Sequence, residues 1–237
     1  MSDETETKRR RLIYGRRHGH KLRGRQAELM ESLLPELRVH KPGTAPPEIG
    51  RLDPTELFTP APEGVKLEIG FGGGEHLAAQ AKANPATGFI GAEPYINGVA
   101  KLLSVIDDEA LSNIRLHDDD ARDLLEWLAP SSIAGIYILY PDPWPKSRHR
   151  KRRFVRPETI AQMARIMAPG AELLFASDIA DYVRWTLSLM QHVPEFEWTA
   201  KQADDWRCPP KGWTTTRFEA KAFAAGRTPT YLTYRRL

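Results

Sequence analysis

The chain has 237 residues, 41% of them apolar, so it can bury one good core, most simply one α/β domain with an appendage. Its lone cysteine, Cys208, excludes an internal disulfide and a paired-cysteine site, and we expect no metal centre. The net charge is only +3, the first residues are acidic and polar, and no apolar run is long enough to span a membrane. We therefore expect a soluble, cytoplasmic protein, monomeric or homodimeric, that does not bind membranes.

Residues 8–25 are rich in Lys and Arg, and glycines and two histidines interrupt the run. Such a segment repels itself, so we expect it to be disordered when free. It could be a solubilising tail. Tyr14 and the alternation of guanidinium groups with glycine favour instead an arm that contacts the phosphates of a nucleic acid.

Residues 26–37 have apolar side chains at helical spacing, which predicts a helix that docks loosely on the main domain and that Pro35 ends early. Residues 41–63 are rich in proline and predict a linker, with Leu57 and Phe58 as its anchor. We therefore divide the chain into residues 1–63, a basic arm with a short helix and a linker, and residues 64–237, the main domain.

In the main domain, apolar strands alternate with segments of helical periodicity. The predicted strands are 65–69, 89–92, 114–117, 133–140 and 172–176, and the predicted helices are 75–83, 98–106, 121–128, 157–167 and 181–190. Later antiparallel strands are expected around Phe223 and over 230–234. The alternation predicts an α/β fold with a mostly parallel, doubly wound sheet and an antiparallel edge, which binds ligands at the carboxyl ends of its strands.

A glycine-rich turn follows the first strand, in the pattern Glu68-x-Gly70-x-Gly72-x-Gly74. Glycines allow positive φ and let a ligand lie against bare backbone at a helix N-terminus. Glu75 takes the place of the third glycine of a dinucleotide site, which argues against a pyrophosphate. The acid before the turn suits a cationic ligand, and the pattern looks like the first motif of Rossmann-like methyltransferases. The turn could also be a tight connection only.

Four acids stand at or just beyond the ends of successive predicted strands, and we expect them to surround one crevice: Glu68, Glu93, Asp120 and Asp142. Glu93 comes about 20 residues after the glycines, where an acid can accept hydrogen bonds from ribose hydroxyls. Asp120 could accept from an adenine amino group. Acids at strand ends also cap helices, which is the interpretation we prefer for Asp118 and Asp119.

The fourth strand leads into Pro141-Asp142-Pro143-Trp144-Pro145-Lys146, in which three prolines stiffen the loop and fix Asp142 and Trp144. Six Lys or Arg follow between positions 148 and 156. A charge run by itself is usually a solvated face. Beside a rigid acidic loop at the crevice, it indicates nucleic-acid binding.

With these motifs the sequence resembles the bacterial tRNA (guanine-N7-)-methyltransferase family. The resemblance rests on residues 67–74, 91–93, 120–121, 141–146, 177–178 and 215–219. It implies a Rossmann-like class I methyltransferase fold, S-adenosylmethionine as the cofactor, and guanine at tRNA position 46 as the methyl acceptor.

The resemblance also implies roles for individual residues. The expected cofactor contacts are Glu68, Gly70, Gly72, Gly74, Glu93, Asp120 and Asp142, with Asp142 also at the reaction centre. The expected substrate contacts are Lys146, Asp178, Thr216, Arg217, Phe218 and Glu219. The sequence departs from the family at Arg217, where members often carry Lys; both side chains are cationic and differ in hydrogen-bond geometry.

The guanine N7 already exposes a lone pair, so its methylation needs no base. We therefore assign Asp142 orientation and electrostatic stabilisation, with proton abstraction as the less favoured role. His117 and His149 are not needed as bases. Residues 211–219 by themselves indicate a turn with an edge strand. Two other functions stay open: a nicotinamide-dependent oxidoreductase, and a non-catalytic protein that binds RNA through the basic arm.

Overall fold

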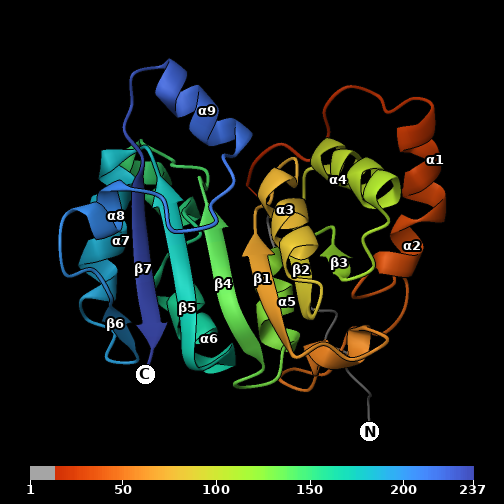
Figure 1. Ribbon diagram of the computed structural model, residues 1–237, viewed down its shortest axis with the longest axis horizontal. Helices are drawn as coiled ribbons and strands as arrows, with labels where there is room; N and C mark the ends of the chain where they lie inside the picture. The colour runs from red at the N-terminus through yellow and green to blue at the C-terminus, as the bar shows by residue number, and fades with distance from the viewer. Residues whose placement is uncertain (1–13) are drawn as a thin grey trace, which may run out of the picture.

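The computed structural model describes residues 14–237, so the part of the predicted basic arm before Tyr14 lies outside the described residues. One seven-stranded sheet runs through the molecule in the order β3-β2-β1-β4-β5-β7-β6 (Figure 1). Strands β1 to β5 are parallel, and β7 is antiparallel to both β5 and β6. The strands are β1 Gly64–Ile69, β2 Thr87–Ala92, β3 Ile114–His117, β4 Ile133–Leu139, β5 Met167–Ser177, β6 Phe196–Trp198 and β7 Thr230–Arg236. The predicted fold class is confirmed.

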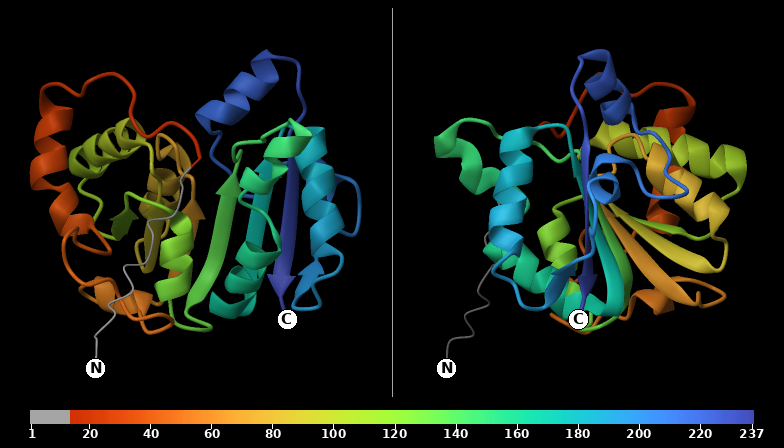
Figure 2. Two further views of the ribbon diagram at one scale, coloured as in Figure 1. Left: turned by 180° about the vertical axis from the view of Figure 1, so that it is seen from behind. Right: turned by 60° about the vertical axis from the view of Figure 1, so that its left-hand side comes forward.

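Helices cover the sheet on both faces, as a doubly wound fold requires. Helices α5, α6 and α7 lie on one face, and α3 and α4 lie on the other face over the half that contains β1 to β3 (Figures 1 and 2). Helix α9 lies beyond the carboxyl ends of the central strands. The helices are α3 Glu75–Ala83, α4 Ile96–Glu109, α5 Ala121–Trp127, α6 Pro157–Ile166, α7 Ala180–Met190, α8 Asp204–Arg207 and α9 Arg217–Ala224.

The N-terminal helix α1 Arg25–Ser32 packs beside α4, and α2 Leu34–Leu37 packs against α1 and β3 (Figure 1). The expected loose docking is wrong, because Leu34 is fully buried in a cluster with side chains of α3 and α4. The predicted helix does end early, because α1 stops at Ser32, just before Pro35. Pro35 then stands in the first turn of the separate helix α2, where its missing N–H has no intrahelical acceptor to lose.

The proline-rich stretch before β1 is fixed to the domain. It contains the short 3-10 helix η1 Pro54–Leu57, and Phe58 beside it is buried in the main core, which confirms the predicted anchor.

The part of the basic arm that the structure describes lies against the main domain, although its charge predicted disorder. The backbone N–H of Ile96 donates to the carbonyl of Arg17 at 2.9 Å, and the N–H of Gly19 donates to Asn97 Oδ1 at 2.6 Å. Arg17 also pairs with Asp119 at 3.0 Å. Two backbone hydrogen bonds and one ion pair thus hold residues 17–19 against the domain.

The predicted strand around Phe223 is wrong, because this residue lies in helix α9. Thr216 is the N-cap of that helix, and its hydroxyl accepts a hydrogen bond of 3.1 Å from the N–H of Glu219. Thr-x-x-Glu is a common start of a helix, a signal that the strand propensity of the threonines obscured. Residues 211–219 are therefore a turn and a helix start instead of an edge strand.

The strand order reverses between β1 and β4, and a doubly wound sheet binds its ligands at such a point. None of the helices formed by residues 14–237 has the length and apolar character that crossing a membrane requires.

Candidate active site at the carboxyl ends of the strands

A cavity of about 380 Å³ lies at the point where the strand order reverses. Five of the residues predicted to bind the cofactor line it: Gly70, Gly72, Glu93, Asp120 and Asp142. They come from the segments after β1, β2, β3 and β4. The cavity is completed by residues 14–16 of the arm, by part of the basic run, and by Phe218 on α9.

Glu93 shapes the glycine turn. The backbone N–H of Gly72 donates to one oxygen of the Glu93 carboxylate at 2.7 Å, and the N–H of Tyr95 donates to the other at 2.9 Å. Gly72 has a φ of +59°, which favours glycine. Burial raises the pKa of Glu93 despite these two donors. Each carboxylate oxygen can accept a further hydrogen bond, so Glu93 can still bind ligand hydroxyls.

Two of the predicted cofactor residues do not line the cavity. Gly74 begins α3 with a φ of +77°, and a Cβ there would lie 2.6 Å from Leu102 Cδ1, so this glycine permits close packing of α3 on α4. Glu68 is buried and forms a 2.7 Å hydrogen bond with Nδ1 of His76. Cofactor contact by Glu68 and Gly74 therefore stays a prediction.

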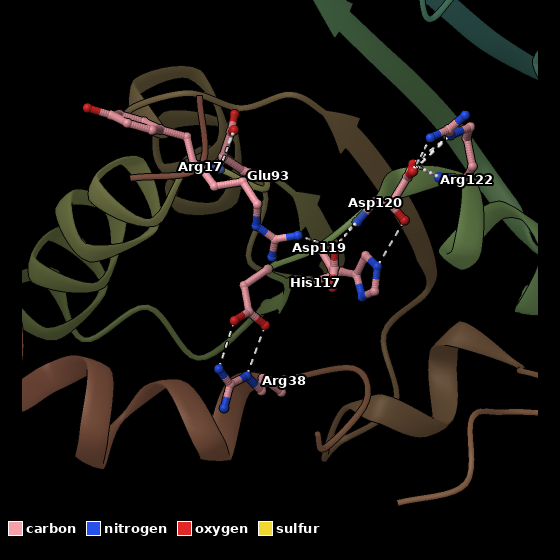
Figure 3. Close-up of polar contacts among 9 residues, drawn as sticks. Arg17, Arg38, Glu93, His117, Asp119, Asp120 and Arg122 are labelled. Atoms are coloured by element: carbon pink, nitrogen blue, oxygen red, sulfur yellow. Dashed lines mark hydrogen bonds and ion pairs between the residues drawn. The ribbon is translucent and has the colours of Figure 1, made fainter. Parts of the chain in front are cut away.

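The three acids after β3 have separate roles (Figure 3). Asp120 is the N-cap of α5: it accepts from the backbone N–H of Arg122 at 2.9 Å and also pairs with its guanidinium group. Asp119 pairs with Arg17 of the arm. The preferred capping role of Asp118 and Asp119 is therefore wrong. The residue that caps α5 is Asp120, which also lines the cavity.

Asp118 instead forms a two-pronged ion pair with the guanidinium of Arg38, at 2.9 and 2.7 Å. His117 in the same segment is buried, and its ring N–H at Nε2 donates to the Asp120 carbonyl at 3.0 Å. Burial lowers the pKa of His117, so the ring is neutral near pH 7 and donates to that carbonyl. This arrangement agrees with a structural role for His117.

The loop after β4 holds Asp142 between two strained residues. Tyr140 has a φ of +52° and Trp144 a φ of +41°, conformations that bulky side chains seldom adopt. Asp142 is exposed toward the cavity, yet the surrounding protein desolvates its carboxylate and raises its pKa. A Cβ on Gly15 would lie 3.4 Å from Asp142 Oδ2, so the arm approaches this acid closely.

Arg152 joins the arm to this loop. Its guanidinium carbon lies 4.7 Å from the ring centre of Tyr14 and 4.9 Å from the ring of Trp144. A cation beside two aromatic faces is a favourable arrangement. The two basic stretches of the sequence, which are more than a hundred residues apart, therefore meet at one side of the cavity.

Four of the six residues predicted to bind substrate, 216–219, are consecutive at the start of α9. Lys146 and Arg217 are exposed, Thr216 caps α9, and Asp178 pairs with Arg227 at 2.6 Å. Phe218 alone among the six lines the cavity, and its ring lies 3.2 Å from the position of a Cβ on Gly72. The substrate contacts of these residues stay predictions.

Glu219 is 1% exposed and connects α9 to the sheet. Its carboxylate accepts from the indole N–H of Trp213 at 2.7 Å, from the hydroxyl of Tyr140 at 3.1 Å, and from the hydroxyl of Tyr231. Sequence reasoning identified neither Trp213 nor Tyr140 as parts of this network. A buried acid with three donors supports the position of α9 above the cavity.

Comparison with known proteins agrees with this geometry. A family model described as "Putative methyltransferase" matches residues 62–232. The chain is 50% identical over 235 residues to the tRNA (guanine-N(7)-)-methyltransferase of Bradyrhizobium diazoefficiens, covering 99% of this chain and 98% of that one. It is 47% identical over 234 residues to the protein of the same name from Agrobacterium fabrum, covering 99% of both.

Two solved structures share the fold. The 16S rRNA methyltransferase KamB aligns with a TM-score of 0.56 at 17% identity, over 74% of this chain and 89% of that one. An rRNA methylase from Streptococcus thermophilus aligns with a TM-score of 0.51 at 13% identity, over 74% and 87%. The fold and the sequence matches together place the chain: it belongs to the tRNA (guanine-N7-)-methyltransferase family.

Proposed function

We propose that the protein transfers a methyl group from S-adenosylmethionine to N7 of guanine in tRNA, at position 46 of the variable loop. One observation carries the proposal. The carboxylate of Asp142 faces the same cavity as Glu93 and the glycine turn, and cationic segments lie beside that cavity.

The acids of the cavity fit a cationic ligand. Neither Glu93 nor Asp142 has a cationic partner among residues 14–237, and burial raises the pKa of both. A positively charged ligand would offset this desolvation. S-adenosylmethionine is such a ligand, and it supplies an electrophilic methyl group on a sulfonium. Gly70, Gly72, Glu93 and Asp120 would hold it.

The acceptor chemistry determines what the side chains must do. The N7 lone pair of guanine forms the new bond to the methyl carbon as the bond from carbon to sulfur breaks, and the positive charge moves to the purine. No proton leaves N7, so no residue has to act as a base. Asp142 can accept from the guanine N1–H and amino group and stabilise the developing cation, while the stiff loop provides alignment.

The RNA would lie along the cationic side of the cavity. Arg16 and Lys151 are exposed beside it, and Lys146 and Arg217 are exposed nearby in the chain. Such groups contact phosphates without reading sequence, so tRNA binding should weaken steeply with salt.

Nucleoside analysis tests the proposal. Unmodified tRNA is incubated with the protein and labelled S-adenosylmethionine, digested and separated. We expect label in 7-methylguanosine only. Label in N1- or N2-methylguanosine would overturn the mechanism.

The same preparation separates the two alternatives. An oxidoreductase would bind NADH and not S-adenosylhomocysteine. A protein that only binds RNA would transfer no methyl group, whether it carries Asp142 or the Asp142→Ala substitution.

A further inference from the structure

Arg153 differs from the other cations of its basic run because it is buried. The residue is 1% exposed, whereas Arg148 and Lys151 are exposed in the same run. Burying a guanidinium costs free energy unless its charge and its N–H groups find partners. The position of Arg153 therefore needs an explanation other than contact with RNA phosphates.

The partners of Arg153 come from two separate parts of the site. Its Nε donates a 2.8 Å hydrogen bond to the backbone carbonyl of Pro143. Its Nη2 forms an ion pair with Asp181 on α7. The guanidinium also lies 4.8 Å from the ring centre of Tyr182 and 5.3 Å from that of Trp185. The group thus bridges the loop after β4 and helix α7.

The chain just after Arg153 is fixed to the same helix. The N–H of Val155 donates to the hydroxyl of Tyr182 at 3.2 Å, and the indole of Trp185 donates to the carbonyl of Val155 at 2.7 Å. These two hydrogen bonds hold the segment against α7 independently of Arg153. The bond from Arg153 to Pro143 therefore links the loop to a part of the chain whose position is already fixed.

Pro143 directly follows Asp142, and the loop is bounded by the left-handed Tyr140 and Trp144. Strained backbone persists only where neighbouring groups enforce it. Tyr140 is held on one side through its hydroxyl by Glu219. On the other side, the carbonyl of Pro143 accepts the hydrogen bond from Arg153.

We propose that Arg153 is a positioning residue: its buried guanidinium ties the Pro143 carbonyl to α7 and so holds the Asp142 carboxylate at the cavity for methyl transfer. This inference rests on the proposed function. The planar guanidinium presents N–H donors in two directions and so reaches both the Pro143 carbonyl and Asp181. The single ammonium group of a lysine cannot reproduce this geometry.

The test is Arg153→Lys, which keeps the positive charge near Asp181 and loses the bond to Pro143. Single-turnover methyl transfer at saturating tRNA and S-adenosylmethionine should fall about 10- to 100-fold, as expected for a small misplacement of an aligned group. The dissociation constants for S-adenosylhomocysteine and for tRNA should change less than about threefold, because Arg153 contacts neither ligand in the proposal.

Arg184→Lys is the matched control. Arg184 also pairs with Asp181, at 4.0 Å, but it lies on α7 outside the basic run and its side chain is 72% exposed. We expect the parent transfer rate in this variant. An equal fall in both variants would show that guanidinium pairing with Asp181, and not the bond to Pro143, is what matters, and would overturn the positioning role.

Thermal unfolding of Arg153→Lys shows whether a slower transfer comes from a misplaced loop in a folded protein or from loss of the folded state. The proposal is overturned if Arg153→Lys transfers at the parent rate, or if the rate and both affinities fall together. If this variant is unfolded at the assay temperature, the same rates and affinities are measured for Asp181→Asn. That substitution removes the charged partner of Arg153 and leaves the guanidinium of Arg153 in place. Absence of 7-methylguanosine with the parent protein would instead refute the proposed function itself.

Discussion

The backbone N–H of Gly72 donates to the carboxylate of Glu93 at 2.7 Å, so the acid after β2 sets the conformation of the turn after β1. The two segments that the sequence predicts to hold the cofactor are therefore one unit. A substitution of Glu93 should also change the conformation of the glycine turn, because the carboxylate accepts from the backbone N–H of Gly72 as well as from that of Tyr95.

Glu93→Gln should weaken S-adenosylhomocysteine binding about 10- to 100-fold, since hydrogen bonds to charged groups are worth about 1.5–3 kcal/mol. Isothermal titration calorimetry measures the change. Glu75→Gln is the control, because Glu75 pairs with Lys101 and does not line the cavity. Equal affinities of the parent and Glu93→Gln would contradict the assignment.

Gly74→Ala should destabilise the protein more than Gly43→Ala. Both glycines have positive φ, which costs an alanine about 1–2 kcal/mol. A Cβ at Gly74 would also overlap Leu102, whereas a Cβ at Gly43 would meet open space. Overpacking adds about 1–3 kcal/mol. Denaturant unfolding should show this difference, and equal losses would mean that α3 and α4 are not packed as described.

Asp142→Asn should lower methyl transfer about 100-fold, the typical loss when one stabilising group of a reaction centre is removed. Because burial raises its pKa, Asp142 favours folding most when protonated, and that contribution is lost as the pH rises through its raised pKa. At neutral pH the asparagine variant should therefore be at least as stable as the parent.

The same pKa predicts the pH dependence of the parent enzyme. Methyl transfer should fall as the pH is lowered through a value above the ordinary pKa of aspartic acid, because the carboxylate form is the one that stabilises the purine cation. Single-turnover rates across a pH series, with tRNA binding measured in parallel, give this value. A parent rate that does not change over the acidic range would contradict the role of Asp142.

Glu219→Ala should lower both stability and tRNA methylation and leave cofactor affinity nearly intact. It removes the acceptor of one buried donor, the hydroxyl of Tyr231, and of two partly buried ones, and leaving a buried donor unpaired costs about 1–3 kcal/mol. Phe218→Ala, next to it on α9, removes a ring that is 50% exposed and should lower methylation without loss of stability. A melting temperature measured beside the methylation rate separates the two effects. Equal losses of methylation and cofactor affinity in Glu219→Ala would argue against this division.

The sequence predicted the sheet well because its parallel strands are short apolar runs between amphipathic helices. Residues 114–117 and 75–83 have the predicted bounds. It predicted the region around Phe223 poorly, since the threonines that precede it favour strands in isolation, and the Thr216 cap acts only through its contact with the following turn.

The sequence predicted those residues of the cavity whose place follows from the end of a strand. Glu93, Asp120 and Asp142 meet because parallel strands end at one edge. The roles of buried charges were not predictable. Nothing in a run of six Lys or Arg distinguishes the buried Arg153 from its exposed neighbours, and the ion pairs of Asp118 and Asp119 depend on where the N-terminal segment lies.

The most direct test of the central claim uses two tRNA transcripts, one ordinary and one with 7-deazaguanosine in place of guanosine. The second keeps the guanine N1–H and amino group and lacks the N7 lone pair. With labelled S-adenosylmethionine, we predict methylation of the ordinary transcript and none of the deaza transcript, with similar binding of both. Equal methylation of the two transcripts would contradict transfer to N7 at the Asp142 cavity.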